Sequence, residues 1–342
     1  MEKRELLQVL GVGLGVAIID PMRAMAQRRI LRGGPAGDFP YAAGHSPEFR
    51  KFLGGVRVGE ARAHGALLVF WLQGGIPAPY LSISTLEEAR SRGDLLITER
   101  EQATVPDLIV DNRGKTHVLL LAGEILVGGK QNRIVTEDIL LPPLSGPRSL
   151  GVYCVEQGRW DGRSSSFSTR GGFAARDLRS KVMERADQGQ VWAEVKKYAG
   201  KVGAASPTES YQAIYDKADV KQHQQEVEHS IPAPAPAAVG AAVFVGEKLS
   251  GLDLFQDPGL FARQWPKLLR AHAIDAYGLH APRKPDEARL RARVADLLGR
   301  AARVEGTLRQ NAGVGELFEF RVEAFRGSAL VAEAQVVHAA VL

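Results

Sequence analysis

The stretch HVLLLAGEILVGGKQNRIV (His117–Val135) contains the pattern that decides the fold. Both of its ends are dominated by apolar and β-branched residues, which predicts two strands. Between them lies a polar run, Gly123 to Arg133, with a carboxylate, a lysine, two amides and an arginine. Burying such groups without partners costs several kcal/mol. We therefore expect this run to lie at the surface, to bind within itself or to hold a ligand.

The same strand pattern extends in both directions from this stretch. Apolar runs bounded by glycine, proline and polar turn residues predict strands at 56–63, 66–73, 95–99, 108–112, 117–122, 133–141 and 150–156. One short helix interrupts them, because Thr85 and Glu88 have the spacing of a capping box. The sequence thus predicts a β-rich part over 56–160.

The second half of the chain alternates between helical and strand patterns. We predict a helical part over 176–229, a strand at 239–245, helices over 257–304 and closing strands over 306–342. Residues 27–55 are predicted as an extended lead-in, because they combine arginines and a glycine-proline cluster with little apolar periodicity. The expected fold class is α+β: one domain over 56–342, with an antiparallel, sandwich-like β core and a helical segment inserted between two strand-rich parts.

Composition limits the classes of function. The 342 residues are 45% hydrophobic and carry a net charge of +5, a mild excess that favours anionic ligands but does not indicate nucleic-acid binding. Cys154 is the single cysteine, so an intramolecular disulfide and a cysteine-based zinc site are excluded. We predict no metal-binding residues and no membrane-spanning segment.

Residues 1–26 have the pattern of an export signal. Lys3 and Arg4 precede an apolar run from Val9 to Ile19, and Ala24 and Ala26 supply the small residues that precede a cleavage site. The Lys-Arg pair resembles a twin-arginine signal with lysine at the first position. We therefore expect a periplasmic or extracellular protein. The alternative is a cytoplasmic protein whose N-terminal helix has an apolar face.

Two polar segments are the candidate site. In the first, Lys130 and Arg133 would bind an anion while Gln131 and Asn132 hydrogen-bond to the rest of the ligand. The alternative is a glycine-rich bulge with solvated polar residues.

The second segment runs from Cys154 to Trp160. Gln157 and Arg159 would contact the ligand, and Trp160 would stack on a flat ring. Glu156, together with Glu124 of the first segment, is the candidate catalytic base or orienting group. The alternatives are a structural ion pair between Glu156 and Arg159, and a Cys154 that is a small buried hydrophobic residue.

The two polar segments, Gly123–Arg133 and Cys154–Trp160, resemble part of a known family. Together with Gln188–Trp192, the run from Gly246 to Phe255, and the closing residues Gly327–Leu330 and Val337–His338, they resemble the ARG and rhodanese-phosphatase-superfamily-associated protein domain from about Val56 to the C-terminus. That family is named for its association with ADP-ribosylglycohydrolases and phosphatases. By analogy, the resemblance implies a link to ADP-ribose or NAD-related metabolism. An exported protein would be separated from cytosolic nucleotide pools, so the export signal weighs against that link.

Two functional hypotheses follow. In the first, the exported domain binds or processes a small anionic ligand of the nucleotide or ADP-ribose-like class. In the second, it is a non-catalytic envelope protein that binds a macromolecular partner through its sheet face. No pattern in the sequence specifies a cofactor or an oligomeric state, and either hypothesis is compatible with a protein that is not an enzyme.

Overall fold

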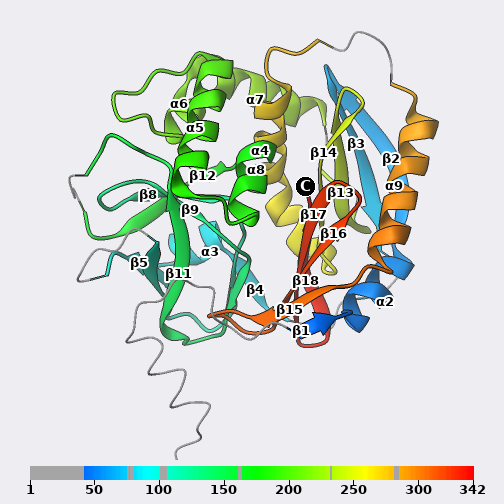
Figure 1. The fold of residues 1–342 in the computed structure, drawn as a ribbon, viewed down its shortest axis with the longest axis horizontal. Helices are drawn as coiled ribbons and strands as arrows, with labels where there is room; N and C mark the ends of the chain where they lie inside the picture. The colour runs from blue at the N-terminus through cyan, green and yellow to red at the C-terminus, as the bar shows by residue number, and fades with distance from the viewer. Residues whose placement is uncertain are drawn as a thin grey trace, which may run out of the picture. The chain divides into compact units, whose positions relative to one another are not determined.

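The computed structural model describes residues 42–342 apart from 75–76, 78–80, 101–105, 161–163, 232 and 281–284. The export signal predicted for residues 1–26 lies outside the described residues. In the described part, three β-sheets and eight helices pack in layers (Figure 1).

The largest sheet has nine strands, and its central strands are buried on both faces. Its order is β1 (Ala42–Gly44), β15 (Gly306–Gln310), β16 (Glu316–Val322), β17 (Phe325–Ala332), β18 (Gln335–Val341), β14 (Lys248–Leu254), β13 (Ala238–Val245), β3 (Leu67–Gln73) and β2 (Arg57–His64). In β3, Leu68 and Phe70 join one hydrophobic core while Val69 and Trp71 join another. Successive side chains of a strand point to opposite faces, so this strand anchors both cores.

Helices cover the two faces of this sheet. On one face lie α2 (Pro47–Gly55) and α9 (Glu287–Ala301), and on the other lies the long helix α8 (Pro258–Ala276) (Figure 1). Residues 42–55, predicted as part of an extended lead-in, instead form β1 and α2. The prediction is wrong there because Phe49, Phe52 and Leu53 place three buried side chains on one helix face and Ser46 caps its first turn.

A second sheet has six strands and belongs mainly to the first half of the chain. Its order is β12 (Phe167–Phe173), β8 (Glu124–Gly128), β9 (Arg133–Val135), β11 (Gly146–Cys154), β6 (Asp107–Asn112) and β5 (Leu95–Thr98). A three-stranded sheet, β10 (Ile139–Leu141), β7 (His117–Leu120) and β4 (Ile83–Thr85), packs on it. In β7, Val118 and Leu120 face the six-stranded sheet, while Leu119 joins the core around α8. The three-stranded sheet thus lies between the six-stranded sheet and the core around α8.

The remaining helices form a cap beside the six-stranded sheet. They are α4 (Arg176–Met183), α5 (Gln188–Val202), α6 (Gln212–Asp216) and α7 (Ala218–Ser230), with α3 (Leu86–Ser91) next to the small sheet. Strand pairing is antiparallel except between β4 and β7. The α+β fold predicted from the sequence is confirmed. None of the helices in the described residues is long and apolar enough to cross a membrane.

Candidate functional site

The two polar segments predicted as the site do meet. Cys154 of β11 pairs with Arg133 of β9, which places the residues after one strand beside those before the other. The backbone amide of Asn132 donates to Glu156 Oε2 at 3.0 Å. Arg159 Nη1 donates to the carbonyl of Gly129 at 2.7 Å. Residues 128–133 and 154–160 are therefore one hydrogen-bonded unit.

Within this unit the polar groups bind one another. Arg159 donates to Glu156 Oε2 through Nε at 3.0 Å and Nη2 at 2.7 Å, and the Thr208 hydroxyl donates to Glu156 Oε1 at 2.6 Å. Although burial acts to raise the pKa of Glu156, the hydrogen bonds from Arg159 and Thr208 hold it below its ordinary value. A carboxylate held in this way is a poor base, so the geometry favours the structural ion pair between Glu156 and Arg159.

The other predicted ligand-binding residues divide between surface and interior. Lys130 Nζ lies 5.4 Å from the centre of the Trp160 ring, and the Trp160 side chain is 54% exposed. Gln131 Nε2 donates to the carbonyl of Gln157 at 3.4 Å. Lys130 and Trp160 are accessible, whereas Gln131 is held inside the unit.

Arg133 is fully buried and cannot reach a ligand at the surface. Its Nη1 lies 3.0 Å from Cys154 Sγ and 3.2 Å from Gln131 Oε1, and its Nη2 lies 3.8 Å from Glu99 Oε1. Burial raises the pKa of the Cys154 thiol, despite the nearby guanidinium. Cys154 is therefore a buried, protonated thiol in the ground state.

Glu124 belongs to a different cluster from Glu156. It begins β8, and the strand rise of about 3.3 Å per residue places it about 13 Å from Gly128 at the other end. Glu124 forms an ion pair with Lys267 of α8, which also binds Glu87 Oε2 at 3.1 Å. Burial raises the pKa of Glu124 to about 7 although Lys267 opposes the shift. The two candidate carboxylates are not a catalytic pair.

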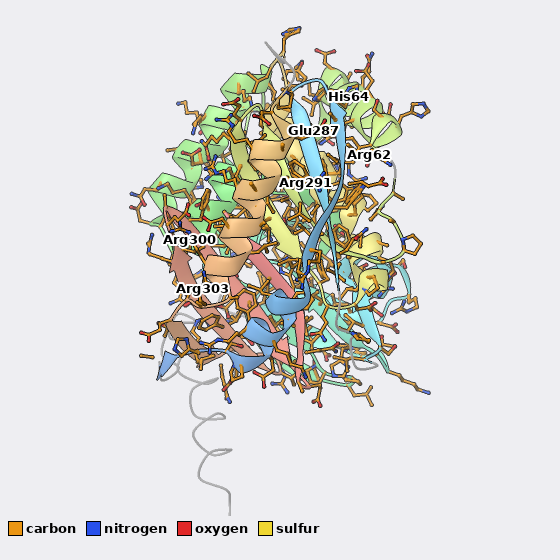
Figure 2. The ribbon with its side chains drawn as sticks, turned by 90° about the vertical axis from the view of Figure 1, so that its right-hand side faces the viewer. Arg62, His64, Glu287, Arg291, Arg300 and Arg303 are labelled. Carbon is orange, nitrogen blue, oxygen red and sulfur yellow. The ribbon has the colours of Figure 1, made fainter. Side chains whose placement is uncertain are left out.

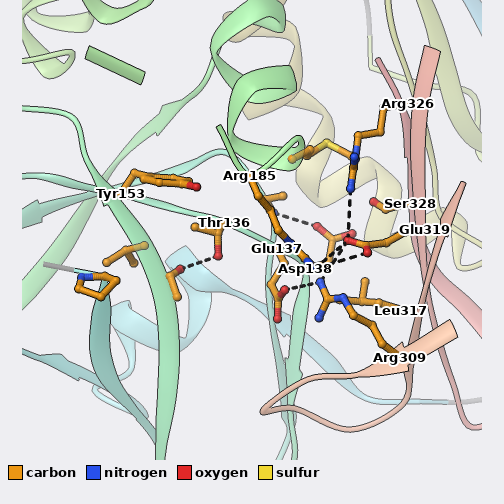
Figure 3. Close-up of a pocket in the computed structure, with 15 residues that line it drawn as sticks. Thr136, Glu137, Asp138, Tyr153, Arg185, Arg309, Leu317, Glu319, Arg326 and Ser328 are labelled. Atoms are coloured by element: carbon orange, nitrogen blue, oxygen red, sulfur yellow. Dashed lines mark hydrogen bonds and ion pairs between the residues drawn. The ribbon is translucent and has the colours of Figure 1, made fainter. Parts of the chain in front are cut away.

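A pocket lies elsewhere, where the six-stranded and nine-stranded sheets approach each other (Figure 3). Its volume is about 200 Å³. It is lined by β11, the segment after β9, the end of α4 and strands β15 to β17. Its polar side chains are Thr136, Glu137, Asp138, Tyr153, Arg185, Arg309, Glu319, Arg326 and Ser328.

Three arginines surround one carboxylate in this pocket (Figure 3). Arg309 Nη2 and Arg185 Nη2 each lie 3.2 Å from Glu319 Oε1, and Arg326 Nη2 lies 3.8 Å from it. Arg309 also forms an ion pair with Glu137. Arg309 is 2% exposed, and its Nε and Nη1 have no hydrogen-bond partner within the described part of the chain. The three guanidinium groups make this wall of the pocket basic, which is the chemistry that binds an oxyanion.

The pKa values of the two glutamates of the pocket are shifted in opposite directions. Burial raises the pKa of Glu137, and Arg309 only partly opposes this effect. For Glu319, burial also acts to raise the pKa, but the hydrogen bond and charge of Arg309 outweigh it and the pKa is lowered.

The pocket is continuous with a buried charge network through Asp138. His338 Nδ1 lies 2.6 Å from Asp138 Oδ2, and His338 Nε2 lies 3.0 Å from Asp253 Oδ1. Arg179 Nη1 completes the network at 2.8 Å from Asp253. Within the described ranges, no group of three or more His, Cys, Asp or Glu side chains has the arrangement of a metal site.

Comparison with known proteins identifies the family. The family model described as the ARG and Rhodanese-Phosphatase-superfamily-associated Protein domain matches residues 55–342. The chain belongs to this family. The resemblance found in the sequence is thereby confirmed, and the pocket and both polar segments lie inside the matched range. No curated protein and no solved structure matched the chain.

Sequence reasoning missed the pocket of this family member. One signal was present, because Thr136, Glu137 and Asp138 interrupt the apolar run at 133–141 just as Gly123 to Arg133 interrupts the preceding one. That run is two strands, β9 and β10, which join different sheets on either side of these residues. Arg309 and Glu319 gave no comparable signal, since an isolated charge in a predicted strand is ordinarily solvated.

Proposed function

We propose that this domain binds a small anionic ligand in the pocket of Arg185, Arg309 and Arg326. One observation carries the proposal: Arg309 is buried at the pocket wall and keeps two nitrogen donors without partners among the described residues. An unsatisfied buried donor on a charged group costs a few kcal/mol. A phosphate or carboxylate oxygen that accepts from one of these two donors would remove part of that cost.

The pocket volume narrows the ligand class. At about 200 Å³ it is smaller than the roughly 300–1,000 Å³ of sites that enclose drug-sized ligands. A whole dinucleotide would not be enclosed. For a nucleotide or ADP-ribose-like ligand, we propose that the pocket takes the phosphate and the sugar attached to it, with the remainder outside.

Titration calorimetry of the full chain with inorganic phosphate, AMP and ADP-ribose tests the proposal. We expect binding that weakens at least roughly tenfold in Arg309→Lys, because lysine keeps the charge but loses the planar pair of donors. The matched control is Arg293→Lys, which changes an exposed arginine of α9. Equal affinities of wild type and Arg309→Lys for every ligand that binds would contradict the proposal, as would a complete absence of binding.

The alternative function, binding of a macromolecular partner through the face of the sheet, has less support than anion binding. The central strands of the nine-stranded sheet have cores on both faces. The face of α9 and β2 is rich in arginine (Figure 2), and some of these arginines form local ion pairs. Arg300 binds Asp296 at 2.8 Å and Arg62 binds Glu60 at 2.8 Å. These ion pairs reduce the positive charge that this face offers to a nucleic acid.

Export remains part of the proposal and rests on the sequence of residues 1–26. N-terminal sequencing of protein recovered from its native host tests it. A mature chain that begins after Ala26 in the periplasm or medium supports export, whereas a cytoplasmic chain that begins at Met1 excludes it.

A further inference from the structure

The pocket has an acidic wall as well as a basic one. Glu137 and Asp138 lie together on the segment between β9 and β10, and Glu319 lies among the three arginines (Figure 3). A bare anion bound by Arg309 would therefore lie close to carboxylates. A ligand that also supplies hydrogen-bond donors to those oxygens matches the site better, because donors and acceptors would then meet on both sides.

The charges of the pocket distinguish hydroxyl donors from ammonium donors. Asp138 is compensated by His338, whose other ring nitrogen faces an Asp253 that Arg179 in turn neutralises. The other charged side chains among the described residues of the lining are three basic and two acidic groups: Arg185, Arg309, Arg326, Glu137 and Glu319. A net positive pocket attracts one anionic group and offers no site for an ammonium ion. The acceptor oxygens are therefore suited to neutral donors, which in small metabolites are hydroxyl groups.

The rest of the lining suits a short carbon skeleton. Pro106, Val152, Met183 and Leu317 contribute apolar wall, and the volume of about 200 Å³ limits the ligand to a few carbon atoms beside its anionic group. A flat hydrophobic ring system would leave the acidic wall without donors and its oxygens unsatisfied.

From this arrangement we infer that the ligand is a small polyhydroxylated anion, a sugar phosphate or sugar acid, with its anionic group on Arg309 and its hydroxyls on Glu137. The inference rests on the proposed anion-binding function and adds the chemical class of the ligand. It also makes Glu137 a specificity-determining residue: the carboxylate accepts hydroxyls and disfavours bare anions.

Titration calorimetry of the full chain with two matched pairs of probes tests the inference. Inorganic phosphate is compared with ribose 5-phosphate, and acetate with gluconate, so that each pair shares one anionic group and differs in hydroxyls. We expect the hydroxylated member of at least one pair to bind at least roughly tenfold more tightly, the gain typical of hydrogen bonds to a charged acceptor. The pair with the larger gain identifies the anionic group as phosphate or carboxylate.

Glu137→Gln supplies the second measurement, and Glu226→Gln, at an exposed carboxylate of α7, is its control. In Glu137→Gln, the affinities for the two members of a pair should differ by less than about threefold. The bare anion should bind this variant as tightly as it binds wild type, or more tightly. A variant that is merely less stable would weaken both members equally. If wild type binds bare and hydroxylated anions alike and Arg309→Lys weakens both, the ligand class is wrong and the proposed function stands. If neither kind of anion binds, both are overturned.

Discussion

His338 Nδ1 lies 2.6 Å from Asp138 Oδ2, and the opposite ring nitrogen faces Asp253 at 3.0 Å. Only the doubly protonated ring can donate to a carboxylate on each side. Burial alone would lower the pKa of His338, but the charges and hydrogen bonds of Asp138 and Asp253 outweigh it and raise the pKa. The strand β18 and the pocket segment after β9 are thus joined by a buried imidazolium.

This arrangement predicts a loss of stability as the pH rises. The folded state holds the His338 proton more tightly than the unfolded chain, in which the pKa is about 6.5. The stabilisation is therefore fully present below about pH 6.5 and disappears as the pH rises through the higher folded-state pKa. We expect His338→Gln to lower the free energy of unfolding by about 3 kcal/mol at pH 6, and by less at pH 9. Urea unfolding across this range measures both values.

The control for this experiment is His229→Gln, at an exposed position of α7. Glu124, whose pKa is raised to about 7, also makes stability fall between about pH 4.5 and 7, so variant and wild type are compared at each pH. A constant difference between wild type and His338→Gln from pH 6 to pH 9 would show that His338 does not carry the charge.

Glu156→Ala should lower stability and leave anion binding unchanged. The substitution removes the acceptor for Arg159, Thr208 and the Asn132 amide, in a unit that is largely buried. Leaving these donors unpaired should cost about 3 kcal/mol of unfolding free energy. Chemical denaturation gives the stability, and calorimetry with phosphate gives the binding. If Glu156→Ala folds but no longer binds phosphate, the anion binds at residues 128–133 and 154–160, as the sequence predicted, and not in the arginine pocket.

Lys267→Met should destabilise strongly, and a second substitution should rescue it. Without the ammonium group, the buried carboxylate of Glu124 loses its cation and is left near Glu87, whose side chain is 37% exposed, at an expected cost of about 3–5 kcal/mol. Adding Glu124→Gln removes one of the two charges and should recover more than half of that loss. Lys221→Met, at an exposed ion pair, should change stability by less than about 1 kcal/mol. Additive losses in the double variant would contradict the coupling.

Capping and turn residues in the sequence predicted the local structure correctly at some positions and not at others. The capping box of Thr85 and Glu88 is present with both of its hydrogen bonds. Ser206 and Glu209, within the predicted helical part, have the same capping-box spacing, but no helix begins there because Glu209 has a φ of 50° and the Thr208 hydroxyl binds Glu156. The turn between β17 and β18 had no signal at all. Glu333 and Ala334 adopt φ of 49° and 58°, in a turn that usually contains Asn-Gly.

The pocket could not be predicted because its groups meet only through tertiary structure. Arg309 lies on β15, Glu137 lies on the segment between β9 and β10, and the two residues are 172 positions apart in the chain. Residues 128–133 of the first polar segment do lie beside 154–160, whereas Glu124 lies in another cluster, and sequence polarity could not show that these groups satisfy one another. The polarity of a buried group indicates that it needs a hydrogen-bond partner. Only the fold shows whether that partner is another residue of the protein or a ligand.

Cys154 gives a last prediction, on the accessibility of the unit at residues 128–133 and 154–160. The thiol is buried, burial raises its pKa, and its sulfur lies against Arg133. Reaction with a thiol reagent then requires local opening, and an opening cost of about 3 kcal/mol slows it roughly a hundredfold relative to the unfolded chain. The rate of colour release from an aromatic disulfide reagent, with and without denaturant, measures this ratio. Glu156→Ala, which loosens the same unit, should react faster than wild type. A native rate close to the denatured one would mean that the unit opens freely and that Cys154 is available for chemistry.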